Sequence, residues 1–260
     1  MSSMPRPNFS LAGKVIVQSG GSGLLGRALV GGLAASGATL VVASRDAAKL
    51  EIQAAAERAA GRRVHAEQVD IGSEDSIHAL RSRVLAAHGR IDGLVFNAVS
   101  RPMRTMTDDL AAWRASMETN ATGFFAIVRA LGDAIAQSGG GSIVNIASMQ
   151  GMIGMNPWLY EGTTMTAPPD YFFHKGGMIN VTRYLASHYG PQKVRVNAVS
   201  PGITDTGVLT DQYRKIGLQG SPTQRLGLPS DIADVVAFLV SEEARWLTGQ
   251  TIQAGGGIVM

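Results

Sequence analysis

Short runs of β-branched and apolar residues alternate with longer stretches of helical periodicity along most of this 260-residue chain. Runs such as KVIV, TLVV and GLVF are apolar at nearly every position, which is typical of strands that helices cover on both faces. The pattern predicts one domain over residues 1–260, an α/β fold with a doubly wound parallel sheet of seven strands. The predicted strands are Lys14–Gln18, Thr39–Ala43, Arg63–Gln68, Gly93–Phe96, Ser142–Ile146, Arg195–Val199 and Thr251–Gln253.

A glycine-rich turn directly follows the first predicted strand. The stretch QSGGSGLLG carries glycines at positions 20, 23 and 26 and leads into the helical stretch LLGRALVGGLAAS. In a Rossmann fold such a turn holds a dinucleotide: Gly20 permits the tight turn, Gly23 lets the pyrophosphate approach the backbone, and Gly26 lets helix and strand pack closely. An ordinary glycine-rich turn between a strand and a helix remains the alternative.

The end of the second predicted strand bears on the choice between NAD and NADP. An acidic residue usually ends this strand in NAD-binding Rossmann folds, where it accepts hydrogen bonds from the ribose hydroxyls. Here the sequence ASRD places Ser44 and Arg45 at that point, and a guanidinium pairs well with a 2′-phosphate. NADP(H) is therefore the preferred cofactor, and NAD(H) is the second choice. Alternatively, Arg45 only begins a solvated helix that Asp46 caps.

Composition excludes several classes of protein. The chain has no cysteine, and therefore no disulfide, thiolate nucleophile or cysteine metal site. Its five histidines show no common ligand spacing, so we expect no metal. A net charge of only +3 with scattered arginines gives no nucleic-acid footprint. The N-terminal stretch lacks an apolar signal core, and the longest apolar stretch is broken by glycines. We expect a cytoplasmic protein with no nucleic-acid or membrane partner.

Tyr171 and Lys175 combine a proton donor with a cation. They are four residues apart in YFFHKGGMINVTRYLASHYG, a segment with helical periodicity, so both side chains project from one face. Such a pair suits acid–base chemistry, because a nearby ammonium stabilises a phenolate. By itself, however, the same spacing often arises by chance on amphipathic helices.

Ser148 and Asn120 are two further polar candidates. Ser148 ends the predicted strand SIVNIAS, at the carboxyl edge where open α/β sheets bind ligands, although serines at such positions are also common N-caps. Asn120 lies in an otherwise helical stretch, where asparagine has a poor propensity. Its side chain is therefore expected to serve a backbone carbonyl or an ordered water.

Together these motifs resemble the short-chain dehydrogenase/reductase family over nearly the whole chain. Motif order and length are similar to the short, single-domain branch, whereas the even glycine spacing is similar to the extended branch of sugar-nucleotide epimerases and dehydratases. Ser19, Leu24, Val99 and Ala254 depart from the residues usual in the short branch. The resemblance rests on SGGSGLLG, VDI at 69–71, FNAV at 96–99, METNATG, VNIAS at 144–148, Tyr171-x-x-x-Lys175, RVNAVSPG at 195–202, and RLGLPSDIA with LTGQ near the end.

The resemblance implies an NADP(H)-dependent oxidoreductase that interconverts a carbonyl and a secondary alcohol of a small molecule, in a homo-oligomer, either a tetramer or a dimer. Tyr171 would be the general acid or base and Ser148 the partner of the carbonyl. Lys175 would support ionisation of the tyrosine and bind the ribose, and Asn120 would anchor a proton-relay water. The implied cofactor-binding residues are Gly20, Ser22, Gly23, Leu25, Gly26, Ser44, Arg45, Asp70, Ile71, Asn97, Ala98, Tyr171, Lys175, Pro201, Gly202, Ile203 and Thr204.

An insertion separates the serine from the tyrosine. Ser148 and Tyr171 are 23 positions apart (171 − 148), more than is usual in the short branch, and the excess falls in NPWLYEGTTMTAPPD. Tyr160 is nearer the customary distance, but the residue four positions after it is Thr164, which cannot act as the cation. Tyr171 is therefore the preferred proton donor.

Two segments are expected to border the substrate: an insertion loop at about residues 149–170 and a flexible lid at about residues 203–224. The string YEGT-x-MT-x-PP-x-Y, with the even glycine spacing, resembles a bacterial subgroup associated with flagellin modification and sugar biosynthesis. That resemblance implies a polar, sugar-like or keto substrate. The expected substrate contacts are Arg101, Trp158, Tyr160 and Glu161.

Three alternatives remain open. A 3-oxoacyl thioester reductase differs in turning over acyl thioesters rather than free sugars. A non-catalytic NADP(H)-binding sensor or scaffold protein is expected to have a broken active site, which Asn120, Ser148, Tyr171 and Lys175 argue against. An epimerase or dehydratase with a retained cofactor fits the glycine spacing, but it needs a larger substrate domain than 260 residues allow.

Overall fold

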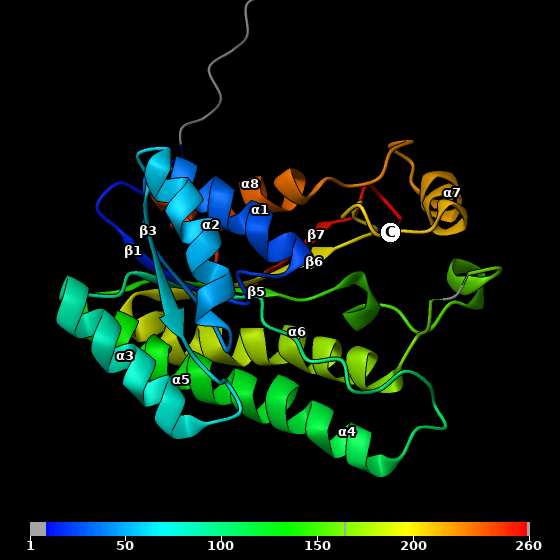
Figure 1. Ribbon diagram of the computed structural model, residues 1–260, viewed down its shortest axis with the longest axis horizontal. Helices are drawn as coiled ribbons and strands as arrows, with labels where there is room; N and C mark the ends of the chain where they lie inside the picture. Colours follow the sequence, from blue (N-terminus) through cyan, green and yellow to red (C-terminus); the bar gives the residue numbers. More distant parts are fainter. Residues whose placement is uncertain (1–8, 164, 259–260) are drawn as a thin grey trace, which may run out of the picture.

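A single parallel sheet runs through the protein. The computed structural model describes residues 9–163 and 165–258, so Thr164 and both ends of the chain lie outside the described residues. The strand order is β3-β2-β1-β4-β5-β6-β7, with every neighbouring pair parallel (Figure 1). The predicted fold class is confirmed, and the strand bounds differ from the predicted ones by at most two residues. The strands are β1 (Val15–Ser19), β2 (Thr39–Ser44), β3 (Arg63–Gln68), β4 (Gly93–Phe96), β5 (Gly141–Ile146), β6 (Val194–Pro201) and β7 (Thr251–Ala254).

Helices cover both faces of the sheet (Figure 1). One face carries α1 (Leu24–Ala35), α2 (Ala47–Ala59) and α8 (Pro229–Val240). The opposite face carries α3 (Glu74–His88), α4 (Leu110–Met117), α5 (Gly123–Gln137) and α6 (Pro169–Tyr189). Short helical turns complete these elements: the π-helix η1 (Glu118–Thr122) and the 3₁₀ turns η2 (Met149–Gly151), η3 (Pro157–Tyr160), η4 (Gly190–Gln192) and η5 (Glu242–Ala244). Among the described residues, no helix combines the length and apolarity needed to cross a membrane.

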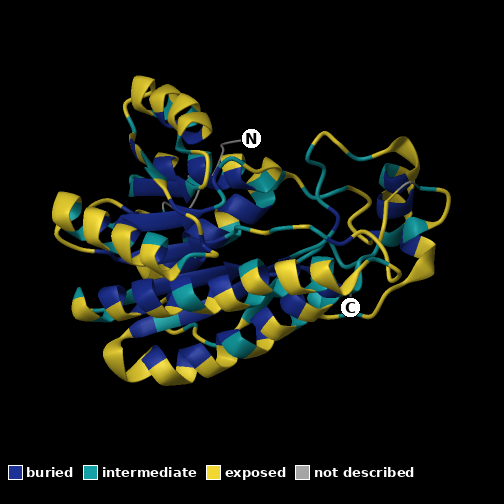
Figure 2. Ribbon diagram, turned by 60° about the horizontal axis from the view of Figure 1, so that its bottom comes forward, coloured by how far each residue is buried: buried dark blue, intermediate teal, exposed yellow. Residues whose placement is uncertain are grey.

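Alternating strand residues supply two separate apolar cores. In β1, Val15 and Val17 belong to the core shared with α3, α5 and α6, whereas Ile16 between them belongs to the core under α1, α2 and α8. The central strands are accordingly buried between exposed outer helix faces, whereas the edge strands β3 and β7 are only partly buried (Figure 2). Burial on both faces explains why the strand sequences are nearly continuous apolar runs.

A third, smaller apolar cluster lies beyond the carboxyl ends of the strands. Met149 and Leu159 come from the segment after β5, and Ile203, Tyr213 and Ile216 come from the segment after β6, which includes α7 (Asp211–Gly220). Figure 1 shows α7 at one end of the molecule, apart from the two helical layers. The insertion and the segment after β6 therefore pack on each other and form a wall above the sheet edge.

Candidate active site

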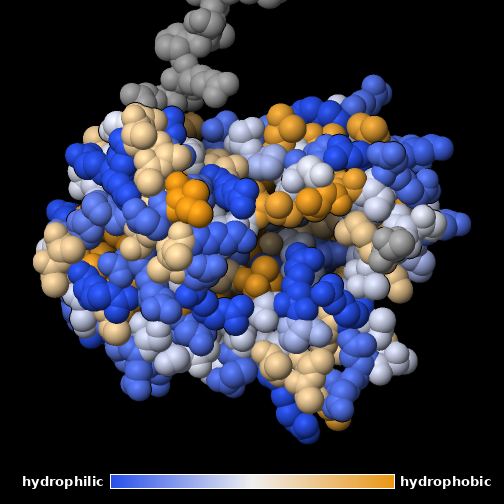
Figure 3. Space-filling model, in the orientation of Figure 1, coloured by the Kyte–Doolittle hydropathy of each residue, from blue (hydrophilic) through white to orange (hydrophobic). Residues whose placement is uncertain are grey.

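A cavity of about 770 Å³ opens at the carboxyl ends of the strands. The ends of β1, β2, β4, β5 and β6 line it, together with the first turns of α1 and α6 and the segment after β6. The strand order reverses between β1 and β4, and open α/β sheets bind ligands at such a switch point. The surface is hollowed near the middle of the view in Figure 3, where apolar atoms lie in the recess.

All residues that the sequence assigns to the cofactor border this cavity. Ser148, Arg101 and Tyr160 border it too, whereas Asn120, Trp158 and Glu161 do not. The cofactor set, grouped from β1 to β6, is Gly20, Ser22, Gly23, Leu25 and Gly26; Ser44 and Arg45; Asp70 and Ile71; Asn97 and Ala98; Tyr171 and Lys175; and Pro201, Gly202, Ile203 and Thr204.

The three glycines of the first turn differ in how strongly the backbone around them excludes a side chain. Gly20 has a φ of +70°, and a Cβ there would lie 2.8 Å from the Ala98 backbone. At Gly26 a Cβ would lie 2.1 Å from the Gly20 carbonyl oxygen. At Gly23 the nearest atom to a Cβ is 3.6 Å away, an ordinary contact. The fold itself thus requires Gly20 and Gly26, and the space at Gly23 faces the cavity.

Gly23 is also the N-cap residue of α1. No side chain among the described residues caps this helix, so the N–H groups of its first turn are available to an anion. Leu24, the first residue of α1 and one of the departures from the short branch, lines the cavity with a half-exposed side chain. The helix end therefore offers both an anion site and an apolar contact.

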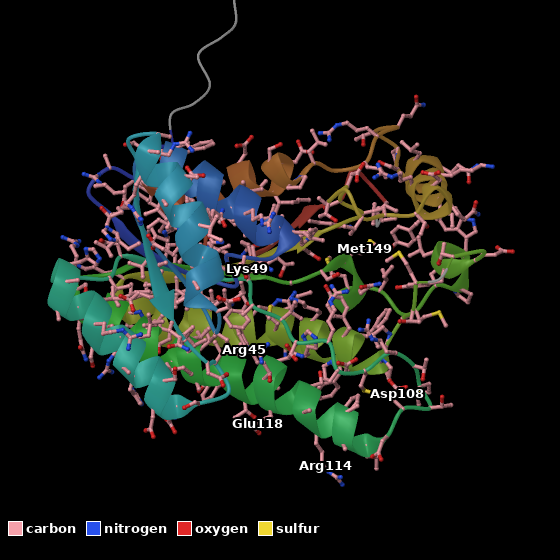
Figure 4. All side chains as sticks on the ribbon, in the orientation of Figure 1. Arg45, Lys49, Asp108, Arg114, Glu118 and Met149 are labelled. Carbon is pink, nitrogen blue, oxygen red and sulfur yellow. The ribbon has the colours of Figure 1, made fainter. Side chains whose placement is uncertain are left out.

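Arg45 stands at the end of β2 (Figure 4). Its neighbour Asp46 is engaged as the N-cap of α2, where Oδ1 accepts a hydrogen bond of 2.9 Å from the Lys49 N–H. The Arg45 side chain lines the cavity and forms no ion pair or hydrogen bond with residues 9–163 or 165–258. The charge of Arg45 is thus available to a ligand. Asp46 caps the helix, and this part of the alternative interpretation agrees with the structure.

Lys175 is almost completely buried, with 3% of its surface exposed. Its Nζ donates a hydrogen bond of 2.6 Å to the Ile146 carbonyl oxygen at the end of β5, and it lies 5.6 Å from the centre of the Tyr171 ring. Burial, and after it the charge of Arg101, lowers the pKa of Lys175 to about 7. Both Tyr171 and Lys175 line the cavity, so the helix does bring a phenol and an amine to one site.

Ser148 follows β5 and caps the 3₁₀ turn η2. Its Oγ accepts a hydrogen bond of 3.3 Å from the Gln150 N–H, while its own hydroxyl proton has no acceptor among the described residues. The residue is 8% exposed and lines the cavity. It therefore acts as a cap through its oxygen and keeps its proton for a ligand.

Asn120 lies in the π-helix η1, between α4 and α5, and is buried outside the cavity lining. Its side chain forms hydrogen bonds with both backbone groups of Ser100: Nδ2 donates to the carbonyl and Oδ1 accepts from the N–H, each at 2.8 Å. Nδ2 also donates to Ser116 Oγ at 2.9 Å. The side chain thus serves the backbone of the loop after β4, and π-helical turns of this kind are frequent at functional sites.

Ser116 extends this network to α6, a connection that the sequence analysis missed. Its hydroxyl donates a hydrogen bond to Asp170 Oδ2, and Asp170 is 1% exposed in the first turn of α6, next to Tyr171. Ser116 stands four residues before Asn120 along the α4–η1 segment, a spacing that places side chains on one face. That spacing was the available signal, although nothing in the sequence identified Asp170 as its partner.

The insertion contributes to the cavity through Tyr160, an expected substrate contact, and through three residues that were not named as contacts. These three are Met165, Thr166 and Pro168. Trp158 and Glu161, the other two expected contacts in the insertion, do not line the cavity: Trp158 packs against Gly220 of α7, and Glu161 is exposed at the end of η3.

The geometry of the 3₁₀ turn explains this arrangement. With three residues per turn, consecutive side chains of Pro157–Tyr160 point about 120° apart. Leu159 occupies the small apolar cluster and Tyr160 faces the cavity, which leaves Trp158 on the outer side. The Tyr160 hydroxyl oxygen accepts a hydrogen bond from the Gln150 side-chain amide N–H, and burial raises the pKa of Tyr160. It therefore differs from Tyr171, which has a lysine beside it.

The segment after β6 borders the cavity at four further positions, which the sequence analysis placed only within the expected lid. They include the aromatic ring of Tyr213, whose centre is 6.5 Å from that of Tyr160. The flexibility of the expected lid stays a prediction. Among the described residues, no group of three or more His, Asp or Glu side chains is arranged to hold a metal. The four further lining residues of the segment after β6 are Thr206, Val208, Leu209 and Tyr213.

Comparison with known proteins identifies the family. Residues 22–259 match the family described as Enoyl-(Acyl carrier protein) reductase. The chain belongs to the short-chain dehydrogenase/reductase family. It is 34% identical to an uncharacterized oxidoreductase of Mycobacterium tuberculosis, a match that covers 96% of this chain and 94% of the relative. It is 31% identical to a 3-oxoacyl-[acyl-carrier-protein] reductase of Aquifex aeolicus, over 96% of this chain and 99% of the relative.

A solved structure shows the same fold. The crystal structure of a putative short-chain alcohol dehydrogenase from Sinorhizobium meliloti superposes with a TM-score of 0.86 at 30% identity, covering 97% of this chain and 98% of that one. Since the match spans both chains almost completely, the insertion and the segment after β6 are variations within the short-chain dehydrogenase/reductase fold. The protein is an oxidoreductase of this family, acting between an alcohol and a carbonyl.

Proposed function

We propose that this oxidoreductase uses NADP(H) and reduces a carbonyl, or oxidises the corresponding secondary alcohol, with Tyr171 as the proton donor or acceptor. One observation carries the proposal: the phenol of Tyr171, the hydroxyl of Ser148 and the buried amine of Lys175 line the same cavity as the open glycine turn. A nucleotide held at the turn therefore reaches an acid–base pair without any rearrangement of the sheet.

The residues present fit a dinucleotide with a 2′-phosphate. The uncapped first turn of α1 and the space at Gly23 suit the pyrophosphate. The guanidinium of Arg45 suits a 2′-phosphate, and Asp70, Ile71 and Lys175 line the same cavity. Asp70 and Ile71 would contact the adenine end, and Lys175 would bind a ribose hydroxyl. Among the remaining positions Asn97, Ala98 and the stretch 201–204 complete the walls at the ends of β4 and β6. When bound, the nicotinamide supplies or accepts the hydride.

The chain's own residues supply the proton and the orientation. In the reductive direction the Tyr171 hydroxyl gives its proton to the carbonyl oxygen as the hydride reaches the carbonyl carbon. The free hydroxyl proton of Ser148 holds the same oxygen and fixes its direction. The ammonium of Lys175 stabilises the phenolate that remains, by Coulomb attraction in a poorly solvated site. In the oxidative direction each of these steps is reversed.

The substrate is the less constrained half of the proposal. The resemblance of the insertion implies a sugar-like substrate, but two of the side chains expected to contact it, Trp158 and Glu161, lie outside the cavity lining. The direct experiment is a screen with NADPH and NADH against keto-sugars, keto-acids, steroids and acyl thioesters. We expect oxidation of NADPH in preference to NADH with at least one class. If no carbonyl compound supports oxidation of either nucleotide, the proposal fails.

A second candidate function is a 3-oxoacyl thioester reductase. It is supported by the similarity to the Aquifex aeolicus 3-oxoacyl-[acyl-carrier-protein] reductase over nearly the whole chain. Turnover of an acyl thioester in the same screen, without turnover of free keto-acids, would favour this candidate.

A further inference from the structure

Arg101 is a cation at the reacting end of the cavity, and no described residue forms an ion pair with it. It follows β4 by a few residues, and its guanidinium carbon lies 4.7 Å from the centre of the Tyr171 ring. It forms no ion pair and no hydrogen bond with the part of the chain that the structure describes, residues 9–163 and 165–258. A guanidinium over an aromatic ring keeps its N–H groups available at the ring edge, where a charged ligand group can accept from them.

The charges that line the cavity are unevenly distributed. In the described part of the chain, the lining carboxylates are those of Asp46 and Asp70, which follow β2 and β3. These strands lie on the other side of β1 from β5, so both carboxylates belong to the nucleotide end. Around Tyr171 the charged lining residues are Arg101 and Lys175. The reacting end therefore presents positive charge with nothing in the described lining to neutralise it.

The charge of Arg101 acts on the titratable groups around it at this end of the cavity. Its charge contributes, after burial, to the lowered pKa of Lys175, about 7, and of His174, about 3. It also acts on Tyr160, whose raised pKa it partly opposes. A negative group bound at Arg101 would relieve the repulsion between the two cations, so ligand binding and protonation of Lys175 favour each other.

The backbone beside Arg101 is fixed. Ser100 is held at both its N–H and its carbonyl by the Asn120 side chain, and Asn120 is tied through Ser116 to Asp170 in the first turn of α6. Tyr171 is the next residue of that helix. The buried network therefore fixes the backbone next to Arg101 relative to the helix that carries Tyr171, and the Arg101 side chain, although exposed, lies over the Tyr171 ring.

We propose that Arg101 binds an anionic group of the substrate, and that the substrate is a short oxo acid, or its hydroxy acid, whose carboxylate is close to the reacting carbon. The inference rests on the proposed function, because it takes Tyr171 as the residue that holds the carbonyl oxygen. The hydroxyl belongs to the ring that Arg101 covers, so the carboxylate and the carbonyl are near neighbours in the carbon chain. The carboxylate takes no part in the bond changes, in which the carbonyl carbon gains a hydride and its oxygen gains the Tyr171 proton.

The test compares acids with neutral molecules of the same skeleton. Pyruvate, acetoacetate and levulinate, and the methyl ester of each, are titrated into the NADP-bound protein by calorimetry and are assayed with NADPH. We expect at least one acid to bind at least about tenfold more tightly than its ester, and to show the same preference in kcat/KM, because a charged hydrogen bond has about that value. In Arg101→Gln that acid should lose about tenfold to hundredfold in affinity and its ester less than about threefold.

Arg104→Gln is the matched control. Arg104 is an exposed arginine on the same loop, held through its backbone by Asp108 (labelled in Figure 4), and it does not line the cavity. Its loss removes the same charge without touching the site, so the preference for the acid should persist. Arg101→Lys should retain part of it, since an ammonium keeps the charge but loses the planar fork.

Several results would overturn the inference. Among them are equal affinity of wild-type protein for each acid and its ester, no binding of any acid, and a loss in Arg101→Gln that is equal for acid and ester. The last would mean that Arg101 acts on Tyr171 or on the loop alone. Selective binding of an acid without turnover of any carbonyl compound would support the Arg101 site and contradict the proposed function, so the two failures are distinct.

Discussion

The two ends of the cavity are built in different ways. At the nucleotide end, the parallel strands β1, β2 and β4 and the backbone of the glycine turn set the positions, and close backbone contacts at Gly20 and Gly26 leave little freedom. At the substrate end, the insertion and the segment after β6 pack on each other through five apolar side chains, away from the sheet. The first end depends on backbone geometry, and the second depends on side-chain directions in short turns.

The two ends therefore differ in how well they tolerate amino-acid substitution. A substitution at the nucleotide end brings a side chain against backbone atoms that cannot move. A substitution at the substrate end falls in surface loops, which tolerate sequence change better. Lys175 lies where the two ends meet, because it belongs to α6 but donates to the Ile146 carbonyl of β5. The following predictions test the contrast, from the largest expected effect to the smallest.

Lys175→Met is expected to abolish turnover and yet to stabilise the apoprotein at pH 7, by about 1–3 kcal/mol, because a buried charge is replaced by an apolar side chain of similar length. Since burial lowers the Lys175 pKa from 10.5 to about 7, the unfolded chain binds more protons than the folded one between those values. Wild-type stability should thus rise with pH across that window, and the variant should lack this rise. Denaturant titrations at pH 7 and pH 9 measure both, and a destabilised variant with an unchanged pH dependence contradicts the prediction.

Gly26→Ala is expected to destabilise the fold by about 1–3 kcal/mol, the usual cost of overpacking, because its Cβ would lie 2.1 Å from the Gly20 oxygen. Gly23→Ala is the matched control, since its nearest neighbour is 3.6 Å away. That variant should remain within about 0.5 kcal/mol of wild type but bind NADPH more weakly. Equal thermal stability of Gly26→Ala and wild type would show that the turn is less rigid than its geometry implies.

Arg45→Ala is expected to reduce the preference for NADPH over NADH by about tenfold to hundredfold, the effect of one charged hydrogen bond. Affinity for NADH should hardly change, because Arg45 has no structural partner among the described residues to lose. Binding of both nucleotides, followed by fluorescence, provides the comparison. Equal affinities for NADPH and NADH in the wild-type protein would contradict the assignment of Arg45 to the 2′-phosphate.

Trp158→Ala and Glu161→Ala are expected to change kcat/KM by less than about threefold, since neither side chain lines the cavity and surface changes of this kind are usually small. Steady-state kinetics with the best substrate from the screen test this expectation. A loss of tenfold or more with unchanged NADPH affinity would mean that the insertion reorganises around the substrate.

The sequence predicted the sheet because β-branched runs are required wherever a strand is buried on both faces, and it predicted Gly20 and Gly26 because backbone contacts exclude a side chain there. It predicted a polar role for Asn120 from poor helix propensity, but not the contact with Ser100, which only the folding of α4 beside the loop after β4 creates. Likewise Ser116 and Asp170 are 54 residues apart and nothing local links them. The direction of Trp158 depends on one 3₁₀ turn, which composition does not encode.

Tyr171 is expected to transfer the proton, and Tyr160, which also lines the cavity, is not. Tyr171→Phe and Tyr160→Phe remove one hydroxyl each and leave the rings in place, so they form a matched pair. For Tyr171→Phe we predict a kcat about 10²-fold or more below wild type with NADPH affinity nearly unchanged, and for Tyr160→Phe only a mild loss. Near-normal turnover in Tyr171→Phe, or a larger loss in Tyr160→Phe, would contradict the account.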